Sequence, residues 1–228
     1  MEELFDKSAE YDDMLNKGIS LSGEDKYFFI HGRFADLQKN IPAGKKINAV
    51  LDFGCGVGDA TILIKKYFPH AAITGNDTAA EALKYAREKN SDNGKIRYIE
   101  IKDFNLKNEF DLCYVNGVFH HIPLDQRADA AKMIYDALKP GGLLALFENN
   151  PLNPGTKMVM SRIPFDKDAI TLVPSETRKL LETAGFKLKI KPRFLFYFPK
   201  FLSFLRPIEK LFIHFPMGAQ YYFLAEKE

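Results

Sequence analysis

The sequence predicts an α/β fold of the doubly wound type, in which helices cover both faces of a mostly parallel sheet. From about Ile47 onward, short strand-like runs alternate with helical patterns, as is typical of βαβ units. The runs at 48–53 and 143–148 are almost continuously apolar, which indicates strands buried on both faces. A loop with alternating glycines follows the first of these runs, at the edge where open α/β sheets bind ligands.

Seven segments have the length and composition of strands, and four segments between them have helical patterns. We expect strands at 48–53, 71–76, 96–101, 110–115, 143–148, 186–191 and 220–226. We expect helices at 59–67, 79–90, 125–138 and 175–185. The helix that begins at 125 is followed by Pro140, Gly141 and Gly142, which predict its end.

The composition predicts a soluble, cytoplasmic globular protein. The chain has 228 residues, 46% of them hydrophobic, which suffices for a sizeable core and excludes a disordered chain. Its 32 Lys and Arg against 30 Asp and Glu leave a net charge of +2, too small to indicate nucleic-acid binding. The acidic start is unlike a signal peptide, and no apolar run approaches the roughly 20 residues of a membrane span. Two cysteines, Cys55 and Cys113, cannot form a disulfide framework or a four-ligand zinc site.

The glycine loop indicates a ligand-binding site. Gly54, Gly56 and Gly58 lack a Cβ atom, so the backbone can approach a ligand closely, and the amides of the next helix can bind its polar part. A dinucleotide site has the spacing G-x-G-x-x-G and a small residue beside the pyrophosphate. Here the spacing is G-x-G-x-G, and Asp52 and Asp59 flank the loop. Two carboxylates would repel a pyrophosphate but tolerate a ligand that carries an ammonium or sulfonium group.

The pattern Asp52-x-Gly54-x-Gly56-x-Gly58 resembles the first motif of the class I S-adenosylmethionine-dependent methyltransferases. The resemblance covers roughly residues 45–191 and the final strand. It implies a seven-stranded Rossmann-like sheet whose last strand is antiparallel, S-adenosyl-L-methionine as the cofactor, and methyl transfer as the reaction. The chain looks most similar to the methyltransferases of quinone-type and small-molecule substrates, and the segment 5–12 resembles their leader.

Several residues outside the loop match cofactor positions of that family. Asp77 ends the second predicted strand about 20 residues past the glycines, where a carboxylate can accept both ribose hydroxyls. Asp77 or its neighbour Thr78 can instead cap the following helix. The resemblance implies that Asp103 and Phe104 hold the adenine amino group and ring, although an ordinary loop explains them nearly as well.

The same resemblance assigns the methionine part of the cofactor and the catalytic groups. Asn116 and Gly117, at the end of the fourth strand, would face the methionine, and Arg33, 21 residues before Gly54, is the candidate for its carboxylate. A general base is needed only if the acceptor must lose a proton, and the candidates are His120, His121 and Glu148. His121 can instead pack against the next helix. No metal site is predicted, because no clear cluster of carboxylates is visible.

Two segments lie outside the alternating core. Residues 1–46 are expected to form an N-terminal helical cap on the S-adenosylmethionine-binding domain at 47–228. Residues 192–218 separate the last two strands and contain seven of the twenty Phe residues. Because the sixth strand ends at the cofactor edge, this insert is expected to lie over the active site. Its apolar residues fall on one stripe of a predicted amphipathic helix, with basic residues opposite: Phe201, Phe204, Leu205, Ile208, Leu211, Phe212 and Phe215.

The stripe admits two interpretations, and the function of the chain admits several. The stripe either packs on the domain or provides an apolar entry for a small hydrophobic acceptor, such as an isoprenoid, a quinone-like compound or a lipid. In the second case its basic face would contact an anionic membrane surface. The alternatives are a nucleic-acid methyltransferase that uses the basic stretch 186–210, a non-catalytic cofactor-binding protein, and a nicotinamide oxidoreductase, which the glycine spacing disfavours.

Overall fold

The structure is a computed structural model that describes residues 8–90 and 96–228, with side chains from Met14 onward. The leader-like motif at 5–12 lies outside the residues whose side chains are described. Two helices, α2 (Ser8–Ile19) and α3 (Lys26–Asn40), precede the first strand. Helices thus occupy most of residues 8–40 of the predicted cap segment, and its role as a cap stays a prediction.

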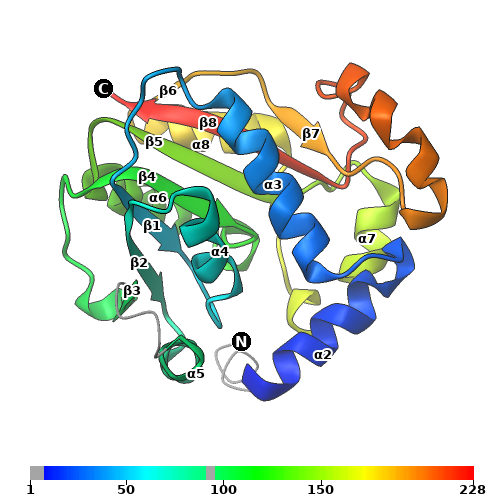
Figure 1. Cartoon of the computed structure of the whole chain (residues 1–228), viewed down its shortest axis with the longest axis horizontal. Helices are drawn as coiled ribbons and strands as arrows, with labels where there is room; N and C mark the ends of the chain where they lie inside the picture. Colours follow the sequence, from blue (N-terminus) through cyan, green and yellow to red (C-terminus); the bar gives the residue numbers. More distant parts are fainter. Residues whose placement is uncertain (1–7, 91–95) are drawn as a thin grey trace.

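One sheet forms the centre of the described chain (Figure 1). Its strands are β1 (Ala49–Phe53), β2 (Ala72–Asp77), β3 (Ile96–Glu100), β4 (Phe110–Asn116), β5 (Leu138–Asn149), β6 (Phe186–Leu188), β7 (Arg193–Leu195) and β8 (Gln220–Lys227). Their order is β3-β2-β1-β4-β5-β8-β6, and β7 pairs with β8 beside β6. The first five strands are parallel, and β8 is antiparallel to β5. The predicted doubly wound sheet with an antiparallel last strand is confirmed.

Helices cover both faces of the sheet. On one face α3 and α4 (Asp59–Tyr67) pack against the strands, and Phe34 of α3 stacks on Tyr114 of β4 with ring centroids 4.7 Å apart. On the other face α6 (Arg127–Ala137) and α8 (Pro174–Thr183) cover a second buried cluster. At the edge, α5 (Ala80–Lys89) packs on β3. The remaining helix, α7 (Pro154–Met160), contacts α2 beyond the end of β5.

The position of α3 follows from local sequence and from one largely buried ion pair. The Asp25 carboxylate accepts a hydrogen bond from the Phe28 amide at 2.9 Å and so caps the start of the helix. Farther along, Asp36 accepts two hydrogen bonds of 2.7 Å from Arg193 in β7 and one of 2.7 Å from the Tyr222 hydroxyl in β8. These bonds fasten α3 to the last strands of the sheet.

The sixth strand is shorter than the sequence predicted. We expected a strand at 186–191, whereas β6 ends at Leu188 and pairing with β8 resumes only at Arg193. Pro192 immediately precedes this second piece, and because proline has no amide hydrogen it cannot donate to the ladder. The break divides the predicted strand into β6 and β7.

The insert 192–218 also differs from the predicted amphipathic α-helix. Its regular part is a 3-10 helix, η6 (Lys200–Leu211), which contains Pro207. Of the two interpretations of the apolar stripe, the one in which it packs on the domain is not borne out, because η6 has no buried residue and the side chains of Phe201 and Phe204 are 76% and 73% exposed. Leu211 is similarly exposed, so this segment presents a cluster of large apolar side chains at the surface.

Candidate active site

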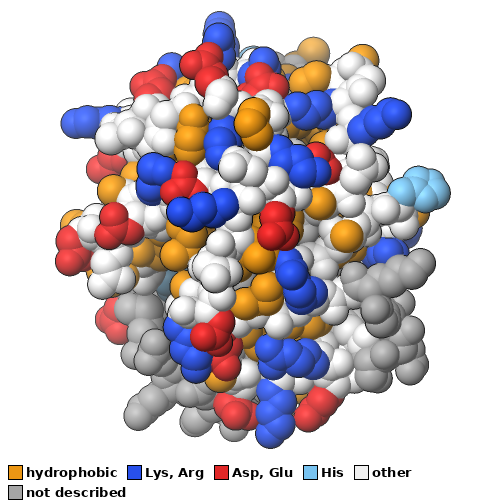
Figure 2. All heavy atoms as spheres, turned by 90° about the vertical axis from the view of Figure 1, so that its left-hand side faces the viewer, with side chains coloured by type: hydrophobic (Ala, Val, Ile, Leu, Met, Phe, Trp, Pro, Cys, Tyr) orange, Lys and Arg blue, Asp and Glu red, His pale blue; other side chains and the backbone are white. Residues whose placement is uncertain are grey.

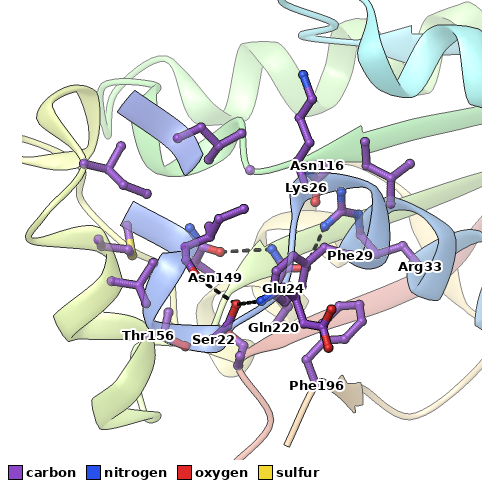
Figure 3. A pocket seen from close by; sticks show the side chains of 18 of the residues that line it. Ser22, Glu24, Lys26, Phe29, Arg33, Asn116, Asn149, Thr156, Phe196 and Gln220 are labelled. Atoms are coloured by element: carbon purple, nitrogen blue, oxygen red, sulfur yellow. Dashed lines mark hydrogen bonds between the residues drawn. The ribbon is translucent and has the colours of Figure 1, made fainter. Parts of the chain in front are cut away.

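A cavity of about 680 Å³ opens beyond the carboxyl ends of β1 and β4. This volume lies within the roughly 300–1,000 Å³ of typical ligand pockets. Its walls come from the glycine loop, the end of β4, helices α2, α3 and α7, and the insert 192–218 (Figure 3). Segments that are far apart in the sequence thus meet at the edge where the sequence predicted the cofactor.

The glycine loop leaves room for a ligand. Gly54, Gly56 and Gly58 have positive φ angles of 72°, 52° and 80°, a backbone region that side chains disfavour. A Cβ atom on Gly54 would lie 2.5 Å from Val118, and one on Gly58 would lie 2.8 Å from the Tyr98 hydroxyl. A Cβ atom on Gly56 would meet nothing within 4 Å. Gly56 therefore marks open space beside the backbone, whereas the other two glycines allow close packing of the loop.

Two polar groups beside the loop match the expected cofactor. One oxygen of the Asp77 carboxylate accepts a hydrogen bond from the Gly56 amide at 2.8 Å, and the other accepts from Ala79 at 2.9 Å. The side-chain oxygen of Asn116 is buried and has no hydrogen-bond partner within residues 8–90 and 96–228. Such an atom needs a donor, and an ammonium group of a ligand supplies one. The residues present therefore fit S-adenosylmethionine.

The carboxylates that flank the loop differ in charge state. Burial, the largest influence, raises the pKa of Asp52 to about 7, while a hydrogen bond of 2.6 Å from the Thr61 hydroxyl lowers it. Asp59 forms ion pairs with Lys26 at 2.5 Å and with Lys89 at 2.7 Å. Lysines from α3 and α5 thus neutralise Asp59, so the repulsion of a pyrophosphate that the sequence predicted from both carboxylates does not come from Asp59.

Arg33 lies at the wall of the cavity. Its side chain is almost completely buried, and it donates hydrogen bonds to the Tyr114 hydroxyl at 2.8 Å and to Gln220 at 2.9 Å. Gln220 in turn donates to Asn149 at 3.1 Å, so one chain of hydrogen bonds links α3, β8 and β5 (Figure 3). This network fixes the guanidinium beside Asn116, in a position that can bind a carboxylate.

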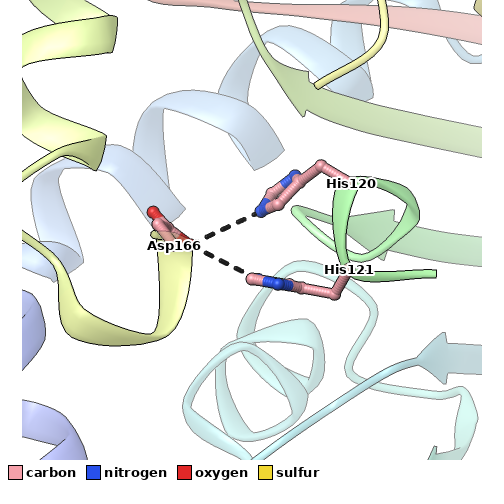
Figure 4. Close-up of side chains that lie close together, drawn as sticks. All are labelled: His120, His121 and Asp166. Carbon is pink, nitrogen blue, oxygen red and sulfur yellow. Dashed lines mark ion pairs between the residues drawn. The ribbon is translucent and has the colours of Figure 1, made fainter. Parts of the chain in front are cut away.

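The three predicted catalytic candidates lie next to one another. The His120 Nδ1 atom is 2.6 Å from a carboxylate oxygen of Glu148, whose other oxygen accepts from the Phe119 amide at 2.8 Å. Asp166 approaches both imidazoles, at 3.6 Å from His120 Nε2 and 3.4 Å from His121 Nε2 (Figure 4). His120, His121 and Asp166 line the cavity, whereas Glu148 stands behind them.

Electrostatics favour a charged His120. Burial by itself lowers the pKa of His120, but the nearby Glu148 carboxylate and Asp166 raise it to about 9. In this state the imidazole carries a proton at neutral pH, so it would have to lose that proton before it could act as a base. The general-base role of these residues stays a prediction.

Some predicted cofactor residues are not part of the cavity wall. Gly54, Gly56, Asp52, Asn116 and Gly117 line it, but Asp77, Thr78, Asp103, Phe104 and Gly58 do not. Asp77 is next to the cavity through its bond to the Gly56 amide. The Phe104 ring is buried and stacks on Phe110 at 6.3 Å, on the α6 side of the sheet. Its assignment to the adenine stays a prediction.

The sequence reasoning missed several residues that complete the site. Asp166 ends a short 3-10 helix after α7, η5 (Pro164–Asp166), where no periodicity or motif in the sequence marks it. Tyr114 and Gln220 belong to predicted strands, and only the pairing of those strands brings their side chains to Arg33. The apolar wall of the cavity could have been predicted from the many aromatic residues of the insert. One of them, Phe196, lines the cavity and packs on Phe29 with ring centroids 5.0 Å apart.

The part of the cavity away from the glycine loop is largely apolar. Its wall is formed by apolar residues of α2, α3, α7 and the insert: Leu15, Ile19, Phe28, Phe29, Met158, Val159, Ile163, Phe196, Phe198 and Phe201. Arg206 of η6 forms an ion pair with Glu24 at 2.9 Å and lies over the Phe28 ring at 4.4 Å. These contacts hold η6 beside the mouth of the cavity.

Comparison with known proteins agrees with this geometry. Residues 50–142 match the family model described as a methyltransferase domain. The chain is 30% identical over 132 residues to a trans-aconitate 2-methyltransferase of Rhodopseudomonas palustris, which covers 58% of this chain and 50% of that protein. It is 29% identical over 143 residues to a malonyl-[acyl-carrier protein] O-methyltransferase of Priestia megaterium, covering 58% of this chain and 51% of that protein. The chain thus spans about half the length of these curated relatives.

The fold is also shared with solved structures. A geranyl diphosphate C-methyltransferase of Streptomyces coelicolor superposes with a TM-score of 0.63 at 16% identity, over 87% of this chain and 76% of that chain. At this identity the likeness concerns the fold alone. Together with the glycine loop, the matched family model and relatives support a methyltransferase domain over residues 50–142, with S-adenosyl-L-methionine as its cofactor.

Proposed function

We propose that this protein transfers the methyl group of S-adenosylmethionine to a small acceptor with a large apolar part, of the isoprenoid, quinone-like or lipid class. The observation that supports this most directly is the cavity, which joins the glycine loop to an aromatic wall. Phe201 belongs to that wall and is also 76% exposed, so the apolar surface continues from the inside of the cavity to the outside.

The residues of the site would mainly bind and align the two reactants. The bound cofactor supplies an activated methyl group on a sulfonium centre, so little further chemical activation is required. Arg33 would hold the cofactor carboxylate, Asn116 its ammonium group and Asp77 its ribose hydroxyls. The aromatic side chains from α3 and the insert would exclude water and orient the acceptor. His120, held by Glu148, would help to orient the acceptor beside the methyl donor.

Membrane contact through the insert is part of the same proposal. No helix in the described part of the chain is long and apolar enough to cross a bilayer. The exposed Phe201, Phe204 and Leu211 stand near Lys200 and Lys210, both of which are exposed. Apolar side chains flanked by lysines bind the interface of anionic membranes. Such contact would bring an acceptor that is dissolved in the membrane to the mouth of the cavity.

The basic charges of the insert give less support to a nucleic-acid substrate. Of the seven Lys and Arg residues between 187 and 210, four are paired with carboxylates: Lys187, Lys189, Arg193 and Arg206. On the face of the molecule opposite η6, acidic and basic side chains alternate without a continuous basic patch (Figure 2). A phosphate backbone is bound by accumulated positive charge, which this arrangement does not provide.

We expect methyl transfer to be measured as S-adenosylhomocysteine formed with an isoprenoid or quinone-like acceptor in anionic vesicles. The variant Phe201→Glu/Phe204→Glu should raise the KM for the acceptor at least about tenfold, or about 1.4 kcal/mol, because charged side chains would block apolar binding. Leu124→Glu is the matched control, since Leu124 is 64% exposed and lies outside the insert. Methylation of only trans-aconitate, malonyl groups or RNA would contradict the proposed class of acceptor. If no acceptor is methylated, the protein would instead be a non-catalytic protein that binds the cofactor.

Affinity for the cofactor should depend on the ionisation of Asp52. Its pKa of about 7 means that the carboxylate gains its charge between about pH 6 and pH 8. An ionised carboxylate attracts the cationic cofactor, so calorimetry should show affinity rising roughly tenfold across this range. Asp52→Asn can still accept the bond from Thr61 but cannot ionise, and it should remove most of the dependence. If the affinity of Asp52→Asn for the cofactor depends on pH as that of the wild type does, another ionisable group causes the dependence.

A further inference from the structure

The cluster of His120, His121 and Asp166 has the donor set of a metal centre. Its three donor atoms, one ring nitrogen from each histidine and one Asp166 oxygen, all lie within 4.8 Å of one another. The two measured nitrogen–oxygen distances are 3.6 and 3.4 Å. These are too long for good hydrogen bonds. They are close to the separation of about 3.0–3.5 Å between ligands that each lie roughly 2.0–2.2 Å from one ion.

The surroundings of the cluster favour an ion as well. Glu148 holds the Nδ1 atom of His120 at 2.6 Å, which leaves the Nε2 atom directed toward Asp166 (Figure 4). A carboxylate behind a ligating histidine is the usual support of such a ligand, because it fixes the tautomer and the ring orientation. Glu148 is itself fixed by the Phe119 amide. Asp166 and Glu148 are both buried, and without an ion a protonated His120 lies between them. A dication would displace this proton and balance both carboxylates in a region of low polarity.

We propose that His120, His121 and Asp166 bind one divalent transition-metal ion of the zinc or iron(II) class. Two imidazoles and one carboxylate suit these ions, whereas magnesium and calcium prefer oxygen ligands alone. The three ligands line the cavity, so the remaining coordination positions face the space for the acceptor. Gly117, which follows β4 at the cofactor edge, lies close to His120, because a Cβ atom on Gly117 would be 3.4 Å from His120 Cε1. The proposed metal centre therefore lies beside the cofactor edge.

The ion would give the site a second way to hold an acceptor. A carbonyl, phenol or carboxylate oxygen could complete its coordination and lie fixed beside the methyl donor. This role rests on the proposed methyl transfer, but the binding of the ion does not. A metal titration therefore tests the centre even if no methyl acceptor is ever found.

Untagged full-length protein, stripped with a chelator, should bind one Co²⁺ per chain, with the intense visible absorption of a four- or five-coordinate site. Zn²⁺ should displace the Co²⁺ and abolish this absorption. We expect Asp166→Asn and His121→Ala to weaken Co²⁺ binding at least tenfold. Asp168→Asn and His70→Ala should bind as the wild type does, since both residues are exposed and lie outside the cluster.

Two results would overturn the proposal. One is the absence of saturable Co²⁺ or Zn²⁺ binding by the wild-type protein, which would make the cluster an ion-pair network only. The other is wild-type affinity in both Asp166→Asn and His121→Ala. Circular dichroism and thermal denaturation of each variant separate loss of the ligand from loss of the fold. If His121→Ala does not fold, His121→Asn, which keeps a polar side chain, replaces it.

Discussion

Replacing Gly56 by valine is expected to weaken the binding of S-adenosylmethionine at least about 100-fold, or roughly 2.7 kcal/mol. A Cβ atom on Gly56 points into open space beside the loop, so the fold would accept the new side chain. The space that it fills is the one that the cofactor needs. Calorimetric titration with S-adenosylmethionine or S-adenosylhomocysteine measures the effect.

The control for this substitution is Gly44→Val. Gly44 has a φ angle of 80° and is also free of neighbours within 4 Å, but it lies in the exposed turn before β1. Both substitutions place valine in left-handed backbone and should each cost about 1–2 kcal/mol of stability. Only Gly56→Val should lose the cofactor. Equal affinity in the two variants would show that the cofactor does not pass beside Gly56.

The largest loss of stability away from the cavity is expected for Asp36→Ala. This carboxylate holds Arg193 through two bonds of 2.7 Å and also accepts from Tyr222. The ion-pair side chains are only 14–16% exposed, so removal of Asp36 leaves an almost buried guanidinium without its counter-charge. Breaking such a pair costs about 3–5 kcal/mol. Urea denaturation should report a decrease of this size in the free energy of unfolding.

Two further variants show whether the buried charge is the cause. Lys132→Ala breaks an exposed pair with Asp136 on α6 and should change stability by at most about 0.5 kcal/mol. The double variant Asp36→Ala/Arg193→Met removes the isolated charge and should be more stable than Asp36→Ala alone. If the double variant is less stable than the single one, the cost comes from lost packing between α3 and the sheet.

The class of fold and the location of the site could be predicted from the sequence because both depend on local patterns. Continuous apolar runs identify strands buried on both faces, and their alternation with helices requires a parallel sheet. In a parallel sheet the carboxyl ends of the strands share one edge. The glycine loop after β1 and Asn116 at the end of β4 therefore had to meet, and the structure brings both to one cavity.

The sequence did not determine which residues form the rest of the cavity wall, because this depends on contacts between segments that are distant in the chain. Asp166 contacts two histidines that lie 45 and 46 positions earlier in the chain, and no periodic pattern in the sequence predicts this contact. The helical stripe predicted for 192–218 depended on an α-helical period of 3.6 residues. In the structure, Pro192 lies at the break between β6 and β7, and Pro207 lies within the 3-10 helix η6. Phe201 and Phe204 of η6 are exposed.

The charge of the site was likewise decided by tertiary structure. The sequence shows Asp52 and Asp59 as two equivalent carboxylates beside the loop. In the folded chain Lys26 and Lys89 neutralise Asp59, while burial raises the pKa of Asp52 to about 7. A carboxylate's charge depends on its burial and its partners, and both are set by the packing of α3 and α5 around the loop. The sequence by itself determined where the glycine loop and its cavity lie, and only the packing of these helices decided the charge at that cavity.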